Sequence, residues 1–218
     1  MYPMKFSILI SRINYFLSSM IKNFIKRNHK CTYCNSSNHE IISKKFFVTK
    51  LVRCEKCSFM FRIPTTSVKE NNKYYQNKYT GGGQDLFDDK KNMTIDMPSK
   101  NETDNFKKFE FKDTDKDYSN YLYILSHIRD YEPKKERKLF DYGCSWGYGS
   151  YQFKKAGYNV SSYEISKTRS DYAKNILNIN MIENLDNVLR DSFDICFSAH
   201  VLEHLPDPKK FLDFGLKY

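Results

Sequence analysis

Four of the six cysteines stand in two closely spaced pairs, and thiolates at this spacing bind metal ions. The pairs are Cys31–Cys34 and Cys54–Cys57, which together make the pattern C-x2-C-x19-C-x2-C of a zinc ribbon. Each pair places two thiolates on one tight turn whose backbone amides point toward the sulfurs, and two such turns supply a tetrahedral four-sulfur shell. Four thiolates leave no coordination position for water. The sequence therefore predicts a structural zinc ion (Zn2+) bound by Cys31, Cys34, Cys54 and Cys57.

A glycine-punctuated turn follows a short apolar strand at residues 139–149, LFDYGCSWGYG. Gly143 and Gly147 allow the backbone to approach a ligand closely, and the helix that begins beyond the turn offers amides to an anion. Glu164 follows 17 residues after Gly147, at the end of a second apolar segment. Strand, glycine turn, helix, strand and acid within about 30 residues predict a nucleoside-binding βαβ unit.

Two motifs resemble those of class I S-adenosylmethionine (AdoMet)-dependent methyltransferases. Residues 141–149 resemble motif I of that family, Asp/Glu-x-Gly-x-Gly-x-Gly, with Ser145 where the middle glycine is usual and Trp146 where a small residue is common. Residues 192–212, which contain VLEHLPDP at 201–208, resemble the fourth strand and the segment after it. The order of the two motifs and the distance between them also fit that family.

The resemblance implies where AdoMet binds. In the family, the turn holds the amino-acid part of AdoMet, and the acid after the second strand binds the two ribose hydroxyls. Tyr79 and Tyr75, from an upstream tyrosine segment, are expected to close over the cofactor, the alternative being ordinary helix packing. Cys144 and Cys196 also have the character of small apolar residues. The residues expected to bind AdoMet are Asp141, Gly143, Cys144, Ser145, Gly147, Glu164 and Tyr79.

The zinc ribbon together with the methyltransferase motifs resembles a subgroup of bacterial enzymes. This subgroup includes sugar C-methyltransferases and enzymes from surface-glycan or natural-product gene clusters. The resemblance implies methyl transfer to a small molecule, a sugar or a nucleotide-linked sugar. His204 is the expected general base, with Glu203 orienting it or binding substrate hydroxyls. The alternative is that Glu203 and His204 only tie down their loop.

Other functions fit the sequence less well. Residues 200–204 spell H-x-x-E-H, the inverted zinc-protease motif, but Pro206 follows at once and the preceding residues predict a strand that ends in a loop. A divalent cation at Glu203 and His204 is a further alternative. An RNA methyltransferase would use the basic N-terminal part to bind phosphates, but the ribbon lacks an aromatic and basic strand array, so a nucleic-acid partner is not expected. A non-catalytic fragment that binds AdoMet and zinc is the third hypothesis.

Alternating strands and helices must position these residues, which predicts an α/β fold with a Rossmann-like parallel sheet. The family's sheet has seven strands, and this sequence supplies four, so we expect an incomplete sheet from the front part of a longer enzyme. The expected sections are an N-terminal amphipathic helix at 1–30, the zinc-binding module at 31–64, a polar linker with a possible lid helix at 65–116, and a partial AdoMet-binding domain at 117–218. Within the last section we expect a helix near 118–128, strands at 139–142, 158–164, 180–183 and 193–198, and helices at 148–156, 166–178 and from about 207.

The positive charge is confined to the N-terminal part of the chain. Residues 1–80 carry 15 Lys and Arg against 3 Asp and Glu, whereas residues 81–218 carry 21 against 23. Residues 4–25 form a helical apolar stripe that Arg12 and Asn14 interrupt too early for a transmembrane span. This helix is expected to pack on the protein's own body, the alternative being peripheral contact with a membrane surface. No secretory signal is evident, which favours a cytoplasmic protein, and the sequence does not indicate an oligomeric state.

Overall fold

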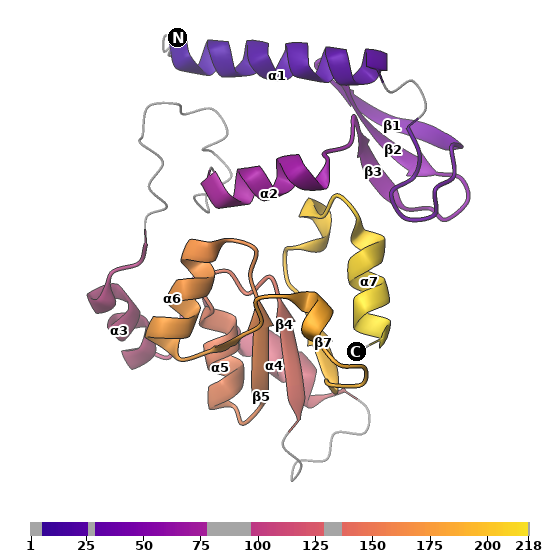
Figure 1. Cartoon of the computed structure of the whole chain (residues 1–218). Coiled ribbons are helices and arrows are strands. Elements are labelled where there is room, and N and C mark those ends of the chain that lie inside the picture. The colour runs from indigo at the N-terminus through magenta and orange to yellow at the C-terminus, as the bar shows by residue number, and fades with distance from the viewer. Residues whose placement is uncertain (1–5, 26–28, 78–96, 129–136, 218) are drawn as a thin grey trace. The chain divides into compact units, whose positions relative to one another are not determined.

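The computed structural model describes residues 6–25, 29–77, 97–128 and 137–217, and within the first helix it describes the side chains from Ile13 to Phe24 (Figure 1). The chain divides into two compact units. Unit one comprises Met1–Ile95 and Leu205–Leu212, and unit two comprises Asp96–His204 and Asp213–Tyr218. None of the helices in the described part of the chain combines the length and the apolar character needed to cross a membrane.

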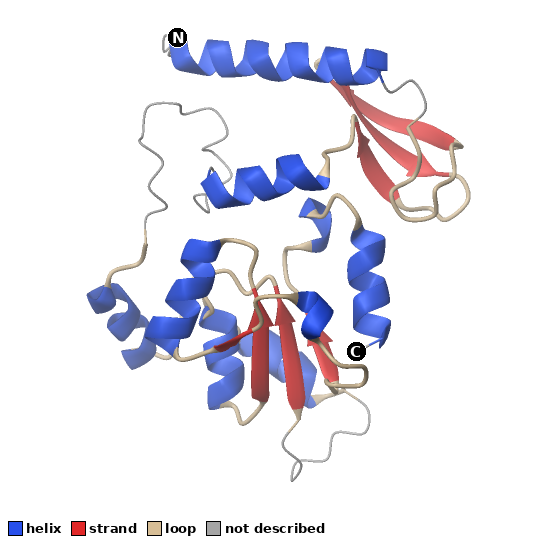
Figure 2. Cartoon of the chain, in the orientation of Figure 1, coloured by secondary structure: helices blue, strands red, loops and turns tan. Residues whose placement is uncertain are grey.

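Unit one is built around a small antiparallel sheet. Helix α1 (Phe6–Ile25) precedes strands β1 (His39–Lys45), β2 (Thr49–Cys54) and β3 (Met60–Ile63), which pair in the order β1-β2-β3, and helix α2 (Val68–Asn77) follows (Figure 2). One cysteine pair precedes β1; of the other pair, Cys54 ends β2 and Cys57 lies in the turn before β3. The antiparallel pairing of β2 with β3 therefore fixes the second pair at one end of the sheet.

The hydrophobic core of this sheet is small and is made partly of cysteine. Apart from cysteines, only three apolar residues of this core are buried. Two of the four paired cysteines are buried to the same extent as these three residues. A core of this size does not offset the chain entropy of about 35 ordered residues by burial alone. The buried residues of the cluster are Cys31, Val52, Cys54, Phe61 and Ile63.

Helix α1 packs on the protein's own sheet, as expected, but it does so by its polar side and not by its apolar stripe. Ser19 is buried, and the amide of Asn23 donates a hydrogen bond to the backbone carbonyl of Val48 at 2.7 Å. An Asn side chain can donate a hydrogen bond to a backbone carbonyl, which Leu and Phe cannot. Ser is small enough to let the helix come close to the sheet. The apolar residues of the stripe are consequently left on the exposed side of α1.

Helix α2 begins at a capping box. The Ser67 hydroxyl accepts a hydrogen bond from the Glu70 backbone amide at 3.3 Å, and the Glu70 carboxylate accepts one from the Ser67 amide at 2.9 Å. Lys22 of α1 lies 2.6 Å from the same carboxylate and is the main reason that the pKa of Glu70 falls to about 2. Glu70 thus links α1 to the start of α2.

Unit two contains a four-stranded parallel sheet, which confirms the α/β class. Strands β4 (Lys138–Tyr142), β5 (Asn159–Tyr163), β6 (Asn180–Met181) and β7 (Ile195–Phe197) pair in the order β6-β5-β4-β7. In chain order β4 is the first of these strands and β7 the fourth, yet the two are neighbours in the sheet. The chain adds β5 and β6 on one side of β4 and then β7 on the other side, so the order of strands reverses at β4. In open α/β sheets, ligands bind at this reversal, beyond the carboxyl ends of the strands.

Helices cover this sheet on both faces and bury its central strand β4. Leu139 of β4 packs in a cluster with Leu125 of helix α4 (Ser119–Ser126) and Phe153 of helix α5 (Tyr148–Lys155). The next residue, Phe140, points to the other face, where its ring lies 5.1 Å from that of Phe214 in helix α7 (Pro208–Lys217). Helix α6 (Lys167–Leu177) connects β5 to β6.

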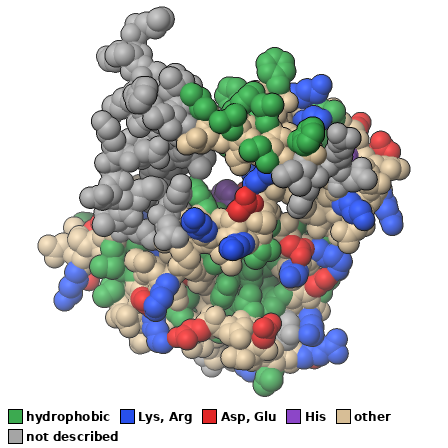
Figure 3. Space-filling view, turned by 45° about the horizontal axis from the view of Figure 1, so that its top comes forward, with side chains coloured by type: hydrophobic (Ala, Val, Ile, Leu, Met, Phe, Trp, Pro, Cys, Tyr) green, Lys and Arg blue, Asp and Glu red, His purple; other side chains and the backbone are tan. Residues whose placement is uncertain are grey.

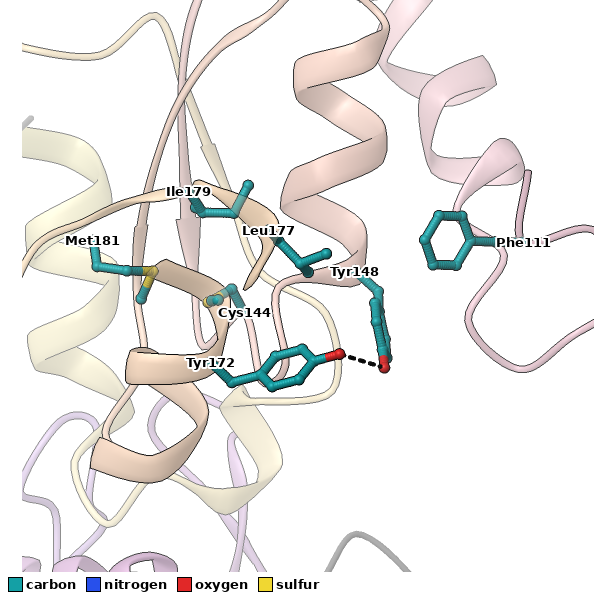
Figure 4. Packing of buried hydrophobic residues seen from close by; sticks show 8 residues of the cluster. Phe111, Cys144, Tyr148, Tyr172, Leu177, Ile179 and Met181 are labelled. Atoms are coloured by element: carbon teal, nitrogen blue, oxygen red, sulfur yellow. Dashed lines mark hydrogen bonds between the residues drawn. The ribbon is translucent and has the colours of Figure 1, made fainter. Parts of the chain in front are cut away.

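The stretch expected to be a polar linker contains a further helix. Helix α3 (Lys100–Lys108) starts at Ser99, whose hydroxyl accepts a hydrogen bond from the Glu102 amide at 3.1 Å. Phe106 stacks on Phe111 with ring centroids 5.8 Å apart. Phe111 lies in the buried cluster that also contains Tyr148 and Tyr172, whose hydroxyls are 3.5 Å apart (Figure 4). Few apolar residues mark α3 in the sequence, which is why periodicity did not predict it.

Candidate functional site

The four paired cysteines converge into one cluster. The Sγ atoms of Cys31 and Cys57 are 3.7 Å apart, and those of Cys34 and Cys54 are 3.5 Å apart. All four sulfur atoms lie within 4.8 Å of one another. Tetrahedral zinc with Zn–S bonds of about 2.3 Å separates its sulfurs by about 3.8 Å. The donor set and its spacing therefore fit a tetrathiolate metal site.

Backbone amides point at the sulfurs, as the tight-turn spacing predicts. The amides of Tyr33 and Cys34 face the sulfur of Cys31, although burial outweighs them and raises the pKa of this thiol. Burial also acts on Cys54, but there the amides of Cys57 and Lys56, with the neighbouring thiols, prevail and lower the pKa to about 6. Such amides stabilise thiolate, the form that binds metal.

The turn after β4 uses three left-handed backbone positions. Gly143 and Gly147 both have φ of +82°, and Ser145 between them has φ of +53°. The Gly143 amide donates a hydrogen bond to the carbonyl of Tyr163 at 2.8 Å, which ties the turn to the end of β5. The two glycines are therefore required by the path of the chain, whatever ligand lies beyond it.

Neighbouring side chains occupy the space that a Cβ atom would need at both glycines. A Cβ on Gly143 would lie 2.5 Å from a methyl carbon of Val201, and one on Gly147 would lie 2.8 Å from the Cβ of Ala173. Close packing within the protein thus accounts for both glycines at these points. Their role in cofactor binding stays a prediction.

Ser145 is expected to strain the turn, and replacing it isolates that strain. A non-glycine residue in the left-handed region costs about 1–2 kcal/mol. We expect Ser145→Gly to unfold with a free energy about 1 kcal/mol higher than Ser145→Ala. Both variants lose the serine hydroxyl, so the comparison separates the backbone effect from the side-chain contact. Urea unfolding followed by the fluorescence of Trp146, the only tryptophan of the chain, measures the difference. Equal stabilities of the two variants would show that the position is unstrained.

Glu164 reaches from the end of β5 to this turn. Its carboxylate accepts hydrogen bonds from the backbone amides of Ser145, at 2.9 Å, and Ser166, at 2.8 Å. Burial nevertheless raises the pKa of Glu164, against the effect of these amides and of the nearby Arg169. The acid and the glycine turn, 17 residues apart in the sequence, are thus in direct contact at the carboxyl ends of adjacent strands.

Arg169 also contacts the turn, although the sequence did not indicate it. It is 2% exposed, its guanidinium donates to the Ser145 hydroxyl at 3.2 Å, and its charged group lies 5.2 Å from the centre of the Trp146 ring. A buried arginine over an aromatic ring is stabilised by cation–π attraction. The sequence signal was Arg169 on the helix directly after Glu164, one turn from its start.

Comparison with known proteins points to the same part of the chain. Residues 140–214 match the methyltransferase-domain family. The match covers about a third of the chain, and most of the matched residues lie in unit two. No curated protein sequence matches the chain.

Two solved structures show partial similarity to the chain. A TehB-like SAM-dependent methyltransferase from Corynebacterium glutamicum is 22% identical with a TM-score of 0.31, over 45% of this chain and 53% of that one. A Thermoplasma acidophilum protein is 18% identical with a TM-score of 0.37, over 55% of this chain and 65% of that one. The chain thus spans between about half and two thirds of these two proteins.

Asp141, the acid at the start of the methyltransferase turn, is buried inside the domain. The Ser150 hydroxyl donates a hydrogen bond to its carboxylate at 2.6 Å, and the Ser162 hydroxyl donates to Ser150 at 2.9 Å. Burial raises the pKa of Asp141 to about 7, and the charge of Glu164 acts in the same direction. Asp141 therefore joins β4, the first turn of α5 and β5 through a hydrogen-bond chain.

The raised pKa of Asp141 predicts that the domain is less stable at neutral than at acidic pH. The unfolded chain releases the Asp141 proton near pH 4 and the folded chain near pH 7. The stability that the proton contributes is full below pH 4 and is lost as the pH rises to about 7, by up to about 4 kcal/mol. We expect Asp141→Asn to lack this loss, so that its stability relative to the wild type rises from pH 5 to pH 8. Urea unfolding at both pH values tests this, and a constant difference between the proteins would contradict it.

The sequence analysis also named Cys144, Cys196 and Tyr79. The Cys144 side chain is 5% exposed and lies in the hydrophobic cluster, as its reading as a small apolar residue implied, so its predicted cofactor contact would have to come from the backbone. Cys196 lies in β7, next to β4. Tyr79 falls outside the described residues.

Glu203 and His204 follow β7, beside the methyltransferase turn. They lie in a short 3-10 helix, Leu202–His204, and both side chains are about half exposed. The Ser198 hydroxyl donates to the Tyr142 carbonyl at 3.1 Å, which fastens this loop to the end of β4. The Glu203 carboxylate lies 4.0 Å from Nε2 of His204.

The geometry of this loop does not support the inverted zinc-protease alternative. His200 has a φ of +57° and precedes the 3-10 helix, so His200 and His204 do not share one helical face as an inverted zinc-protease motif requires. Among the described residues, the four cysteines are the one group of three or more potential metal ligands whose donor atoms all lie within 4.8 Å of one another.

Two cavities of the domain lie away from the turn. One, of about 380 Å³, is lined by residues 182–193 between β6 and β7. The other, of about 680 Å³, lies at the amino ends of β5 and β6, between the ends of α5 and α6. Neither cavity is lined by residues of the glycine turn or by Glu164. The second lies at the opposite end of the strands from the expected cofactor site, since ligands of this fold bind at the carboxyl ends.

Proposed function

We propose that this protein is an AdoMet-dependent methyltransferase whose cofactor binds at the turn between β4 and α5. The observation that carries the proposal is the direct contact between the Glu164 carboxylate and the Ser145 backbone amide. This contact joins an acceptor for ribose hydroxyls to a glycine turn, at the position where nucleosides bind in open α/β sheets. The match of residues 140–214 to the methyltransferase domain supports the same assignment.

The residues of the turn fit this cofactor. Two backbone amides hold the Glu164 carboxylate in place, and each of its oxygens keeps lone pairs for a ribose hydroxyl. Asp141 and Ser150 hold the end of β4 against the first turn of α5, which fixes the turn between them. When bound, AdoMet supplies a methyl group on a positively charged sulfur. The protein then has to hold the acceptor in line with that group and remove the acceptor's proton.

For the acceptor we propose a small molecule, a sugar or a nucleotide-linked sugar. In this proposal His204 takes the proton from the acceptor atom, while Glu203 orients His204 or binds a sugar hydroxyl. Both residues follow β7, whose carboxyl end adjoins the methyltransferase turn, and both are accessible to a substrate. Two adjacent hydrogen-bonding side chains suit a polyhydroxylated acceptor.

Replacing His204 tests the proposed base. We expect His204→Ala to lower kcat for methyl transfer to nucleotide sugars by about 100-fold or more, with AdoMet affinity unchanged, because proton transfer contributes 10²–10⁴-fold to such steps. His127, an exposed histidine of α4's end, gives a matched control as His127→Ala. Undiminished turnover by His204→Ala would remove the base from the proposal. Salt-dependent methylation of RNA, with no transfer to nucleotide sugars, would overturn the acceptor class.

We further propose that the cysteine cluster binds one structural zinc ion in a zinc-ribbon module. The sulfur spacing, the amides directed at the sulfurs and the three-stranded antiparallel sheet support this assignment. Four thiolates exclude a water ligand, so this ion would have no catalytic role.

A further inference from the structure

One side of α1 presents a continuous apolar stripe to the outside of unit one. Hydrophobic side chains gather over the described part of this helix (Figure 3). Each of the six side chains of the stripe is between 39% and 74% exposed. Their spacing of three and four residues places all of them on one helical face. The six residues are Ile13, Phe16, Leu17, Met20, Ile21 and Phe24.

The opposite face of α1 is the one that the protein uses for attachment. The hydroxyls of Tyr15 and Thr49 share a hydrogen bond of 2.6 Å, Asn23 bonds the Val48 carbonyl, and Ser19 between them is buried. Positions 15, 19 and 23 recur every four residues and so define one face. This attachment orients the helix and keeps its apolar stripe turned outward.

The sequence of this segment is strongly basic, and its Lys22 is paired with Glu70. Residues 1–30 contain six Lys and Arg and no Asp or Glu. Lysine and arginine beside an apolar helical face are typical of helices that lie in the plane of a membrane, where they attract anionic lipid headgroups.

The tip of the β1–β2 hairpin adds a second apolar point close to α1. Phe46 and Phe47 are 57% and 94% exposed and directly follow Lys44 and Lys45. Residues 48 and 49, which come next, are the ones that α1 contacts. Aromatic residues beside lysines at an exposed tip suit the headgroup region of a bilayer.

We propose that unit one docks on an anionic lipid surface, with the apolar stripe of α1 inserted in the interfacial region and the hairpin tip beside it. The helix lies on the membrane and does not cross it. An anionic surface complements the charge of residues 1–30, whereas a second copy of this chain would bring two equally basic segments together. The proposal does not depend on methyl transfer.

Vesicle flotation of the full chain tests this docking. We expect binding to vesicles of phosphatidylcholine with about one third phosphatidylglycerol, and at least about tenfold weaker binding to pure phosphatidylcholine. Raising the salt concentration should weaken the binding to the anionic vesicles. The triple variant Leu17→Ser, Ile21→Ser and Phe24→Ser should lose at least about tenfold in affinity, because it removes three of the six apolar side chains.

A matched control replaces exposed apolar residues elsewhere. Leu189→Ser with Leu216→Ser changes two exposed leucines of unit two and should leave binding unchanged. Ile21→Ser alone, with an unchanged melting temperature, covers the case in which the triple variant fails to fold. Equal binding of wild type and Ile21→Ser would overturn the proposal, as would absence of binding to the anionic vesicles. A wild-type dimer that Ile21→Ser converts to a monomer, without vesicle binding, would assign the stripe to a second copy instead.

Discussion

Replacing Cys54 by serine is expected to unfold the β1–β3 sheet while unit two stays folded. The cysteine cluster supplies two of the five buried members of a small core, and without metal that core does not hold the sheet together. Structural zinc in small modules contributes about 10–16 kcal/mol of apparent binding free energy, and Cys54→Ser removes a ligand from the most buried part of the cluster. Without this binding free energy the sheet is not stable, so losing the metal unfolds it.

The single tryptophan makes this outcome easy to resolve. Trp146 lies in unit two, so its fluorescence should stay native in Cys54→Ser, while hydrogen exchange in residues 39–63 should become fast. Zinc content should fall from one ion per chain to none. The control is Cys196→Ser, a cysteine of β7 outside the cluster, which should keep its zinc. Slow exchange in residues 39–63 of a zinc-free Cys54→Ser protein would contradict a structural role for the metal.

Replacing Glu164 by alanine is expected to weaken AdoMet binding by about 100-fold or more. Hydrogen bonds to a charged group contribute about 1.5–3 kcal/mol each, and two ribose hydroxyls would lose their acceptor. The variant also removes the acceptor of the Ser145 amide, which ties the turn to Glu164, and of the Ser166 amide at the start of α6. The cofactor would thus lose a direct contact and a preformed turn at the same time.

Two further variants separate these contributions. Glu164→Gln keeps one carbonyl oxygen for the Ser145 amide, so it should retain the turn and still bind AdoMet weakly. Glu183→Gln changes an exposed acid of unit two that pairs only with the exposed Lys174, and it should bind AdoMet as the wild type does. Isothermal titration calorimetry gives the affinities, and Trp146 fluorescence reports the turn. An unchanged affinity of Glu164→Ala would remove Glu164 from the cofactor site.

Much of unit two could be predicted from residue pattern. Short apolar segments separated by helical stretches have few alternative arrangements, and the four strands lie where alternation and glycine positions indicate. The match of β4 to residues 138–142 and of α5 to 148–155 follows from an apolar run that ends at Gly143 and a helix that starts after Gly147. The contact between the glycine turn and Glu164 follows from the sequence, because adjacent parallel strands have their carboxyl ends at the same edge of the sheet.

The parts that were not predicted depend on contacts between distant residues. Periodicity marked the apolar stripe of α1 but not its direction, which Asn23 and Tyr15 determine through residues of β2 and the hairpin before it. The strain at Ser145 depends on a backbone angle that a serine in the sequence does not reveal. Arg169 was not singled out from the sequence, because its contacts with the Ser145 hydroxyl and the Trp146 ring join residues far apart in the chain.

The most direct test of the central claim is calorimetric titration of the zinc-loaded full chain with AdoMet. The contact between Glu164 and the glycine turn predicts saturable binding of one AdoMet per chain, with at least about 100-fold weaker binding to Glu164→Ala. Absence of AdoMet binding to a wild-type sample with native Trp146 fluorescence would contradict the assignment of this turn as a cofactor site.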